Sequence, residues 1–257
     1  MPTETALITG ASSGIGEELA RLFARDRSHL VLVARSQEKL ERLAAELRKE
    51  HGIEAEVFPK DLADAAAPQA IFDGLAAKGI LVDVLVNNAG FGAAGPVADL
   101  PVQKQIEMIQ VNVTALTYLT RLFLPGMLQR GSGGILNVGS TAGFQPGPYM
   151  AVYYATKAYV LSFTEALAEE LAGTAIKVTC LAPGPTATGF AALANMENAL
   201  LFKLGTMDAK PVAAIGYRGF RRGKVIVVPG FKNRLGAFAV RLGPRSTVRK
   251  LVKRLQT

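Results

Sequence analysis

Short apolar runs alternate along this chain with longer segments whose apolar residues recur at helical spacing. Apolar runs of this length predict buried strands, and they occupy residues 5–9, 30–34, 54–58, 82–87, 135–140, 176–182 and 225–229. Between two of them, residues 36–50 place Leu40, Leu43 and Leu47 on one helix face and charged residues on the other. The alternation predicts an α/β fold with a doubly wound, seven-stranded, mostly parallel sheet and helices on both faces.

The composition agrees with one domain rather than two. A chain of 257 residues with 49% hydrophobic and 19% charged residues can bury a large core without dividing. No segment has the composition of a linker. We therefore expect a single domain over residues 1–230, followed by an extension over residues 231–257 that is not an independent domain.

Cysteine and histidine usage indicates neither a disulfide nor a metal centre. Cys180 is the sole cysteine and lies in an apolar strand, so a buried, inert thiol is expected. His29 and His51 have no cysteine or carboxylate cluster at ligand spacing, so no metal site is predicted. The first strand begins almost at once and no apolar run has the length of a membrane span, which favours a cytoplasmic location.

A glycine-rich turn joins the first predicted strand to a predicted helix. Gly10, Gly14 and Gly16 punctuate the sequence TGASSGIG, and apolar residues at helical spacing follow it. Glycines let the backbone approach a pyrophosphate closely, and the helix N-terminus attracts its charge. Loops also collect glycine for conformational reasons alone, but the position between a strand and a helix favours a dinucleotide site.

A second group of candidate residues lies in the middle of the chain. Tyr153 and Lys157 share a helix face in YYATK, and Ser140 ends an apolar strand upstream. A close ammonium lowers the pKa of a phenol, so we expect Lys157 to make Tyr153 a usable acid near neutral pH. With Ser140 bonded to the same substrate oxygen, the three suit proton exchange with a carbonyl or alcohol. The same spacing also arises by chance, as a surface lysine beside a half-buried tyrosine.

Taken together, these segments resemble the short-chain dehydrogenase/reductase family of the ordinary single-domain type, and the similarity runs from about Thr5 to Gly230. It rests on TGASSGIG at 9–16, Asp61 in KDLAD, NNAG at 87–90, Asn112 in VNVTAL, Ser140, Tyr153, Lys157 and PGPTAT at 183–188. These motifs fall in the family's order and at its spacings. The resemblance implies a Rossmann-type fold and a dinucleotide cofactor.

The resemblance also implies catalytic roles. Tyr153 is the general acid or base, Ser140 orients and polarises the carbonyl, and Lys157 both tunes Tyr153 and binds the nicotinamide ribose. Asn112 corresponds to an asparagine that helps to hold a proton-supplying water, although an asparagine there can also kink or cap a helix.

Further positions are implied to contact the cofactor. Asn88 and Gly90 shape the end of a strand beside the adenine ribose, and Asp61 faces the adenine amine unless it caps a helix. In the family, the residue matched by Thr188, or two positions earlier by Thr186, faces the carboxamide or the phosphates. The complete set is Gly10, Ser12, Ser13, Gly14, Ile15, Gly16, Arg35, Asp61, Leu62, Asn88, Ala89, Gly90, Tyr153, Lys157, Pro183, Gly184, Thr186 and Thr188.

Charge after the second strand predicts which dinucleotide binds. Many such sites place an acidic residue there, which binds the ribose 2′-OH and repels a 2′-phosphate. Here the strand ends in Ala34 and Arg35, a planar cation suited to phosphate, and Ser12 and Ser13 add hydroxyl donors. We therefore expect NADP(H) in preference to NAD(H). Alternatively, Arg35 only solvates the start of the helix capped by Ser36, where a cation opposes the helix dipole.

The charge of the chain is concentrated in its last fifth. Residues 210–257 contain 13 Lys or Arg and no Asp or Glu, whereas the rest of the chain carries 16 basic and 21 acidic residues. The overall charge of +8 therefore comes from this tail. Two apolar stripes at helical spacing run through it: Leu235, Phe238, Ala239 and Leu242, then Val248, Leu251, Val252 and Leu255.

Two interpretations of the basic amphipathic tail stay open. It binds an anionic membrane surface as a peripheral contact, or its stripes dock on the protein's own core or on a neighbouring subunit. Specific binding to nucleic acid is not expected, because no aromatic interleaving or recognition motif accompanies the charge.

The segment after PGPTAT resembles the variable lid over the family's substrate site. Its large apolar residues predict a hydrophobic substrate pocket unless they only pack the lid onto the body: Phe190, Leu193, Met196, Leu200, Leu201 and Phe202. We therefore expect an oxidoreductase acting on an apolar ketone, aldehyde or lipid-like carbonyl, or on the matching alcohol. Epimerisation or dehydration after oxidation stays open.

Two alternative functions remain. One is a membrane-associated reductase of lipid metabolism from the same family; the other is a non-catalytic NADP(H)-binding regulatory protein. The intact Ser140, Tyr153 and Lys157 argue against the second, because a sensor needs no acid. The resemblance also implies a homo-oligomer assembled through the segments near 103–128 and 153–171.

Overall fold

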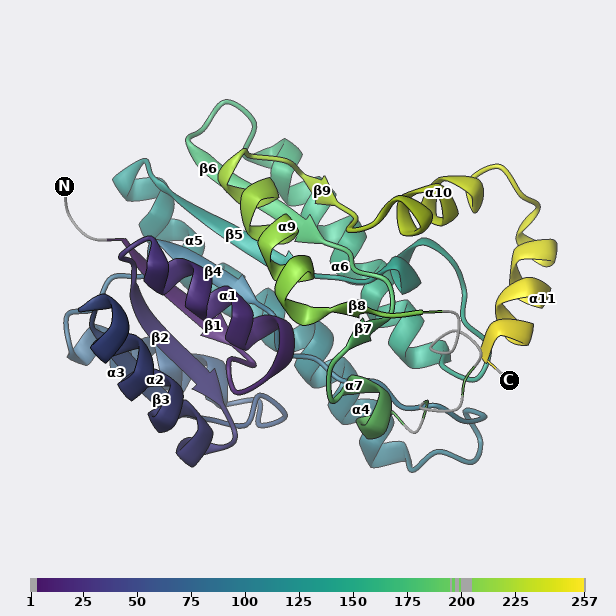
Figure 1. Ribbon diagram of the computed structural model, residues 1–257, viewed down its shortest axis with the longest axis horizontal. Helices are drawn as coiled ribbons and strands as arrows, with labels where there is room; N and C mark the ends of the chain where they lie inside the picture. Colours follow the sequence, from purple (N-terminus) through teal and green to yellow (C-terminus); the bar gives the residue numbers. More distant parts are fainter. Residues whose placement is uncertain (1–3, 195, 197–198, 200–204, 257) are drawn as a thin grey trace.

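The computed structural model describes residues 4–194, 196, 199 and 205–256, and seven of its strands form one parallel sheet (Figure 1). The strand order is β3-β2-β1-β4-β5-β6-β9. Every predicted apolar run contains or overlaps one strand, so the predicted sheet is confirmed. The strands are β1 (Thr5–Thr9), β2 (His29–Ala34), β3 (Ala55–Pro59), β4 (Val84–Asn87), β5 (Gly133–Val138), β6 (Ile176–Leu181) and β9 (Ile226–Val227).

Helices cover both faces of the sheet, because successive strand residues point to opposite sides. In β1, Ala6 and Ile8 pack with α1 (Gly14–Arg25), α2 (Gln37–His51) and α9 (Ala209–Arg221). Leu7 between them packs on the other side, with α3 (Ala67–Ala77), α5 (Leu116–Arg130) and α6 (Ala151–Glu170). The predicted stripe of Leu40, Leu43 and Leu47 is buried on α2 as expected.

Shorter elements surround one end of the sheet. They are α4 (Val102–Ile109), a π-helical turn (Gln110–Ala115) that continues into α5, a 3₁₀ turn (Thr141–Phe144) and α7 (Phe190–Leu193). A separate parallel pair, β7 (Thr186–Ala187) with β8 (Met207–Asp208), was not predicted. Strands of two residues are too short to show an alternating pattern.

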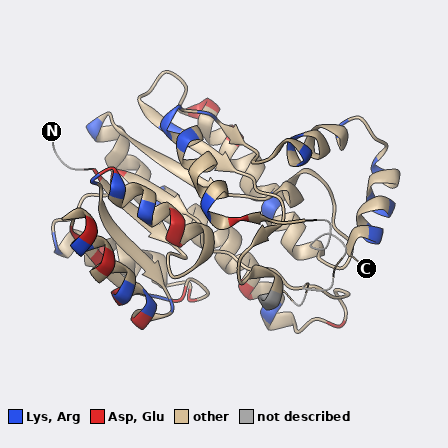
Figure 2. Cartoon of the chain, viewed as in Figure 1, with Lys and Arg blue, Asp and Glu red and all other residues tan. Residues whose placement is uncertain are grey.

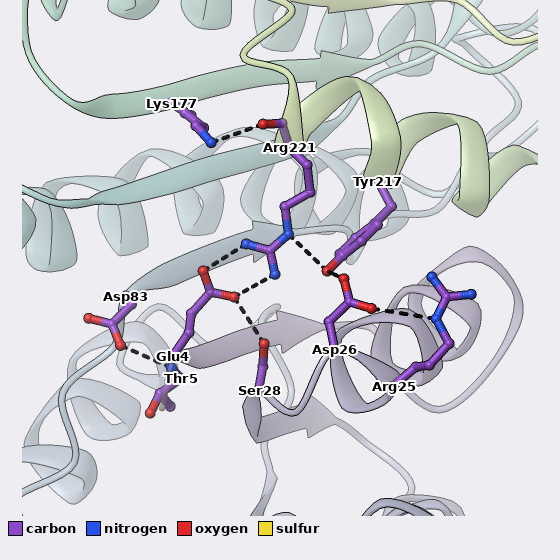
Figure 3. A network of polar contacts seen from close by, with 9 residues as sticks. All are labelled: Glu4, Thr5, Arg25, Asp26, Ser28, Asp83, Lys177, Tyr217 and Arg221. Carbon is purple, nitrogen blue, oxygen red and sulfur yellow. Dashed lines mark hydrogen bonds and ion pairs between the residues drawn. The ribbon is translucent and has the colours of Figure 1, made fainter. Parts of the chain in front are cut away.

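The amino-terminal edge of the sheet is closed by a network of polar contacts (Figure 3). Arg221 at the end of α9 donates two hydrogen bonds of 2.7 Å to the carboxylate of Glu4, just before β1. Its Nε also donates to the Tyr217 hydroxyl at 2.8 Å, which donates to Asp26 at 2.7 Å, and Ser28 donates to Glu4 at 2.9 Å. The network joins the end of α9 to the beginnings of β1 and β2, at the edge opposite the cavity described below.

Two helices follow the last strand and lie outside the sheet and its covering layers. They are α10 (Phe231–Ala239) and α11 (Arg245–Gln256), drawn in yellow at one side of the molecule in Figure 1. Figure 2 shows lysine and arginine along both, without acidic residues. Within the described residues, no helix combines the length and the hydropathy that crossing a membrane requires.

Candidate active site

A cavity of about 990 Å³ opens at the carboxyl edge of the sheet, where the loops after six neighbouring strands meet. In a doubly wound parallel sheet this edge is where ligands bind. The cavity wall contains most of the predicted cofactor residues: Gly10, Ser12, Ser13, Gly14, Ile15, Arg35, Asp61, Leu62, Asn88, Ala89, Gly90, Pro183, Gly184, Thr186 and Thr188. Ser140, Tyr153 and Lys157 line the same cavity, whereas Gly16 and Asn112 lie behind its wall.

The glycine turn forms the floor of one end of the cavity. Gly10 and Gly14 have φ angles of +66° and +60°, a region that residues with a Cβ rarely adopt. A Cβ at Gly16 would lie 2.3 Å from the carbonyl oxygen of Gly10, so a larger residue there would displace the turn. This close packing fixes the start of α1 directly beneath the cavity, and the N–H groups at the N-terminus of a helix attract anions.

The segment after β4 braces this turn. The side-chain amide of Asn88 donates to the carbonyl of Thr9 at 2.8 Å, and the Thr9 hydroxyl accepts from the N–H groups of Asn88 and Ala89 at 3.0 Å each. The Asn88 side chain therefore holds the end of β1 and the glycine turn in place. With its backbone bound in this way, the segment holds Ala89 and Gly90 in the cavity wall.

Cations line the rim after β2. Arg35 lies in the cavity wall, and among the described residues no carboxylate is within ion-pair distance of it. Lys39, in the first turn of α2, and Lys60, directly after β3, also line the cavity. Sequence reasoning missed both lysines. Ser36 occupies the N-cap position of α2 as expected, but its side chain makes no capping hydrogen bond.

Asp61 faces the cavity and does not cap a helix. Its carboxylate accepts from the N–H of Ala63 at 3.0 Å and so closes a local turn, while α3 begins only at Ala67. The helix-cap alternative for Asp61 is therefore wrong.

Ser140 and Tyr153 meet at the centre of the cavity wall. Ser140 follows β5 and is the N-cap of the 3₁₀ turn, where its hydroxyl accepts from Ala142 N–H at 3.0 Å and donates to the Pro183 carbonyl at 3.4 Å. Tyr153 and Lys157 are both buried on α6, one turn apart, with 9% and 6% of their surfaces exposed. The alternative of a surface lysine beside a half-buried tyrosine is excluded by this burial.

The expected lowering of the Tyr153 pKa by Lys157 is wrong for this structure. Burial raises the pKa of the Tyr153 phenol well above its usual range, and a hydrogen bond with Ser140 opposes the rise only in part. The Lys157 ammonium lies 5.9 Å from the centre of the Tyr153 ring and donates to the Val138 carbonyl at 2.9 Å. Burial also lowers the pKa of Lys157 to about 8. The phenol is thus held protonated at neutral pH.

Asn112 organises the wall behind Lys157. It lies in the π-helical turn, and only 1% of its surface is exposed. Its side chain accepts from Phe91 N–H at 3.1 Å and donates to the Phe91 carbonyl and the Thr156 hydroxyl at 3.0 Å each. A Cβ at Gly90 would lie 3.0 Å from Asn112 Oδ1 and 3.4 Å from Lys157 Nζ, which shows how closely these groups surround Gly90. Asn112 therefore lies within a π-helical distortion between α4 and α5, which agrees with the kinking alternative and not with the capping one.

Thr186 and Thr188 both line the cavity, so the uncertainty of two positions in this motif does not exclude either. Thr188 lies against the glycine turn, because a Cβ on Gly14 would come 3.0 Å from its methyl group. The Thr186 hydroxyl instead donates to the Gly184 carbonyl at 2.9 Å.

The far end of the cavity is apolar. Phe190 and Met196 of the predicted lid line it, and the Phe190 ring lies 5.1 Å from that of Tyr153. The side chain of Leu193 and all of Leu200, Leu201 and Phe202 lie outside the described residues. Sequence reasoning missed several other residues of this wall, namely Gln145, Met150, Tyr154, Val252 and Leu255.

Two of these missed residues belong to α11, whose apolar face docks on the protein itself. Val252 is 7% exposed and joins the apolar cluster that contains Tyr153 and Tyr154, and Val248 packs on the same cluster. At the end of the helix, Gln256 donates a hydrogen bond to the Tyr154 hydroxyl. Docking on the chain's own core, one of the two interpretations of the tail, is therefore what α11 does.

Histidine and cysteine residues take no part in the cavity. The Cys180 thiol is buried in β6, as predicted, and His29 accepts a hydrogen bond from Glu54 N–H at 2.9 Å. Over the part of the chain that the structure describes, no three His, Cys, Asp or Glu side chains are grouped so that they would hold a metal ion.

The chain is similar to known proteins over most of its length. The family model described as short chain dehydrogenase matches residues 4–199. The very-long-chain 3-oxoacyl-CoA reductase of Anas platyrhynchos is 35% identical over 222 residues, which cover 84% of this chain and 69% of that protein. The NADP-dependent 3-hydroxy acid dehydrogenase YdfG of Escherichia coli is 38% identical over 179 residues, covering 69% of this chain and 71% of that protein.

The likeness extends to a solved structure. A short-chain dehydrogenase from Sphingobium yanoikuyae in complex with NADPH is 35% identical and superposes with a TM-score of 0.84. The superposition covers 96% of this chain and 97% of the other. The structural similarity therefore reaches beyond residue 199, into the part of the chain that follows the matched family region.

Proposed function

The chain belongs to the short-chain dehydrogenase/reductase family of oxidoreductases, and we propose that it transfers a hydride between NADP(H) and the carbonyl or alcohol carbon of an apolar substrate. The observation that carries the proposal is one continuous cavity, which is lined by the glycine turn at one end and by apolar side chains at the other. Ser140, Tyr153 and Lys157 lie in its wall.

The cofactor is NADP(H) in preference to NAD(H). The residues of this chain fit a phosphorylated dinucleotide, because the packed glycines leave room for a pyrophosphate and Arg35 offers a cation without a carboxylate partner in the described chain. When bound, NADP(H) supplies or accepts the hydride at C4 of its nicotinamide. Of the similar proteins named above, YdfG is NADP-dependent and the Sphingobium yanoikuyae dehydrogenase is in complex with NADPH, which supports the same preference here.

Tyr153 is the proposed general acid and base. In reduction the substrate carbon gains the hydride and its oxygen takes the phenolic proton; in oxidation the phenolate takes that proton back. Burial supports the first direction, because it keeps the phenol protonated. We propose that Ser140 donates a hydrogen bond to the same oxygen, turning its hydroxyl from the carbonyl of Pro183 to do so.

Lys157 and Asn112 are the proposed supports of this proton transfer. The Lys157 ammonium lies close enough to the Tyr153 ring to stabilise a phenolate as it forms, and we propose that it also holds the ribose hydroxyls. Asn112 lies next to Lys157 across Gly90, which supports its role in holding a water that returns a proton to Tyr153. The remaining cofactor residues predicted from the sequence keep the binding roles proposed for them.

The apolar end of the cavity supports an apolar ketone, aldehyde or lipid-like carbonyl as the substrate. Met150, Tyr154, Phe190, Met196, Val252 and Leu255 line it. A pocket of this kind excludes water and binds by contact area rather than by specific polar contacts. The non-catalytic alternative gains no support, because the predicted acid and its partners are buried together beside this pocket.

Domain organisation, assembly and location are further parts of the proposal. Residues 1–230 act as one domain and residues 231–257 as its extension. Exposed apolar residues on α4, α5 and α6, among them Ile106, Leu128 and Tyr159, support assembly of a homo-oligomer through these helices. The buried free thiol of Cys180 fits a reducing cytoplasm. The membrane-associated alternative keeps the same chemistry and is considered below.

The test follows the hydride itself. Purified protein is incubated with NADPH carrying deuterium at C4 and with a panel of apolar ketones and aldehydes, and the products are analysed by mass spectrometry. Deuterium should appear on the new carbinol carbon for at least one bulky apolar substrate. The Tyr153→Phe variant should bind NADPH normally yet lose about 10²–10⁴-fold in turnover. Turnover by this variant equal to that of the wild type would refute the assigned acid.

A further inference from the structure

The two stripes of the basic tail differ in what covers them. Val252 of α11 is buried against the body of the protein, whereas the stripe on α10 and on the turn after it is exposed to solvent. Phe231 at the start of α10 extends this stripe, and the exposed fractions of its four large apolar residues are high: Phe231 76%, Leu235 58%, Phe238 59% and Leu242 75%. These four residues lie within twelve positions and form a continuous exposed apolar surface, which we call the apolar ridge, rather than isolated exposed residues.

The orientation of this ridge is fixed by the opposite side of α10. Asn233 donates to the carbonyl of Pro229 at 2.8 Å and lies against Gly184, where an added Cβ would come 2.4 Å from its side-chain oxygen. Asn233 is at an angle of about 160° from Leu235 around the helix, given 100° per residue. The contact that holds α10 to the body therefore turns the apolar ridge away from it.

Charge identifies the occupant that suits this ridge. Residues 231–256 contain eight lysines or arginines and no acidic residue. Arg234 and Arg241 lie on one flank of the ridge and Lys232 on the other. An apolar face bordered by cations is the pattern that binds an anionic lipid surface, with the apolar residues at the acyl boundary and the cations at the headgroups.

A second copy of the chain suits the ridge less well. In a symmetric dimer the same patch meets itself, so two uniformly basic surfaces would face each other and repel. The exposed apolar faces of α4, α5 and α6 are different, because acidic and basic residues are mixed there, for example Lys104 with Glu107 and Arg121 with Glu165. Those faces suit contact between copies, and α10 does not.

We propose that α10 and the turn after it form a docking surface for an anionic lipid membrane. Phe231, Leu235, Phe238 and Leu242 enter the boundary between headgroups and acyl chains, and Lys232, Arg234 and Arg241 bind the lipid phosphates. Because α11 follows directly and lines the cavity through Val252 and Leu255, docking brings the apolar end of the cavity close to the bilayer. The docking itself does not depend on the proposed reaction.

The experiment measures sedimentation of the full chain with phosphatidylcholine vesicles, with and without phosphatidylglycerol. We expect binding to the anionic vesicles only, falling several-fold as the salt is raised from about 0.1 M to about 1 M, since the screening length shortens from about 10 Å to about 3 Å. Equal binding to neutral vesicles, or no binding to either, would overturn the proposal.

Matched variants separate the ridge from general surface properties. Leu235→Ala with Leu242→Ala should weaken vesicle binding at least about tenfold. The control, Leu81→Ala with Val97→Ala, removes two similarly exposed apolar residues elsewhere, at 62% and 54% exposure, and should leave binding unchanged. For charge, Arg234→Gln with Arg241→Gln should weaken binding, whereas Arg222→Gln with Lys224→Gln, exposed cations outside α10, should have a smaller effect.

Sedimentation velocity without lipid tests the other occupants. The Leu235→Ala, Leu242→Ala variant should keep the oligomeric state of the wild type. If the variant dissociates, the ridge is a contact between copies of the chain and the proposal fails. The proposal also fails if the wild type binds nucleic acid in a parallel sedimentation assay but does not bind vesicles. NADPH-dependent turnover without vesicles should be equal in wild type and variant, so a failed reaction and a failed docking surface give distinguishable results.

Discussion

The cofactor end and the substrate end of the cavity are built in different ways. Residues at the cofactor end, such as Gly10, Arg35 and Asn88, come directly after a strand, and the sheet fixes them through contacts like that of Asn88 with Thr9. Residues at the substrate end come from α7, from the start of α6 and from α11 near the end of the chain. The sheet can therefore preserve the hydride chemistry while the outer segments change which substrate enters.

Substitution of Arg35 should have the largest effect among the changes that alter only the cofactor end of the cavity. In Arg35→Asp, the ratio of kcat/KM for NADPH to that for NADH should fall about 100-fold, because a charge-assisted hydrogen bond contributes about 1.5–3 kcal/mol and the new carboxylate repels the 2′-phosphate. Steady-state kinetics with both cofactors measure this. Selectivity among carbonyl substrates should stay the same. A change in that selectivity would mean that the two ends are not independent.

Lys157 lies between the cofactor end and the substrate end of the cavity. Because it is buried, we expect it to make the free energy of unfolding depend on pH. Its pKa is about 8 in the folded protein and 10.5 as the ordinary value, so the unfolded chain binds more protons between these limits and the folded state gains stability as pH rises. Relative to Lys157→Met, the wild type should gain about 2 kcal/mol in free energy of unfolding between pH about 8 and about 9.5. Urea unfolding at several pH values measures it, and a flat difference would contradict the buried-lysine geometry.

The substrate end should respond to changes in α11, with a smaller effect. Val252→Ala with Leu255→Ala enlarges the apolar pocket and should lower kcat/KM for a bulky apolar carbonyl about tenfold. Leu251→Ala on the same helix is the control, because Leu251 is 58% exposed and does not line the cavity. The ratio of NADPH to NADH use should not change in either variant. Equal losses in the two variants would show that α11 acts through overall helix stability instead.

The cofactor end of the cavity could be predicted from the sequence to a greater extent than the substrate end. The strands and the glycine turn were predictable because local patterns specify them: a short continuous apolar run in β1, and glycines at positive φ after it. The placement of Val252 and Leu255 in the cavity wall was not, because it depends on how a helix folds back over more than a hundred residues onto Tyr154. The amphipathic pattern of α11 indicated that one face is buried, without indicating against what.

The protonation of Tyr153 shows a second limit of the sequence. The spacing of Tyr153 and Lys157 correctly predicted a shared helix face, but the expected lowering of the Tyr153 pKa assumed that the nearby charge outweighs desolvation. In the structure Tyr153 is buried and Lys157 is bonded to Val138, so burial dominates. How far each side chain is removed from water depends on long-range packing, which a four-residue spacing does not report.

The contact of Arg221 with Glu4 has a consequence for how this protein is made. The two residues are separated by 217 positions. During synthesis, the hydrogen bonds of the Glu4 carboxylate with Arg221 can therefore form only after Arg221 has left the ribosome. The same applies to β9, the edge strand of the sheet that comes last in the sequence. Domains fold as units once their residues are present, so a ribosome paused before α9 should hold a nascent chain that is more sensitive to protease than the finished protein.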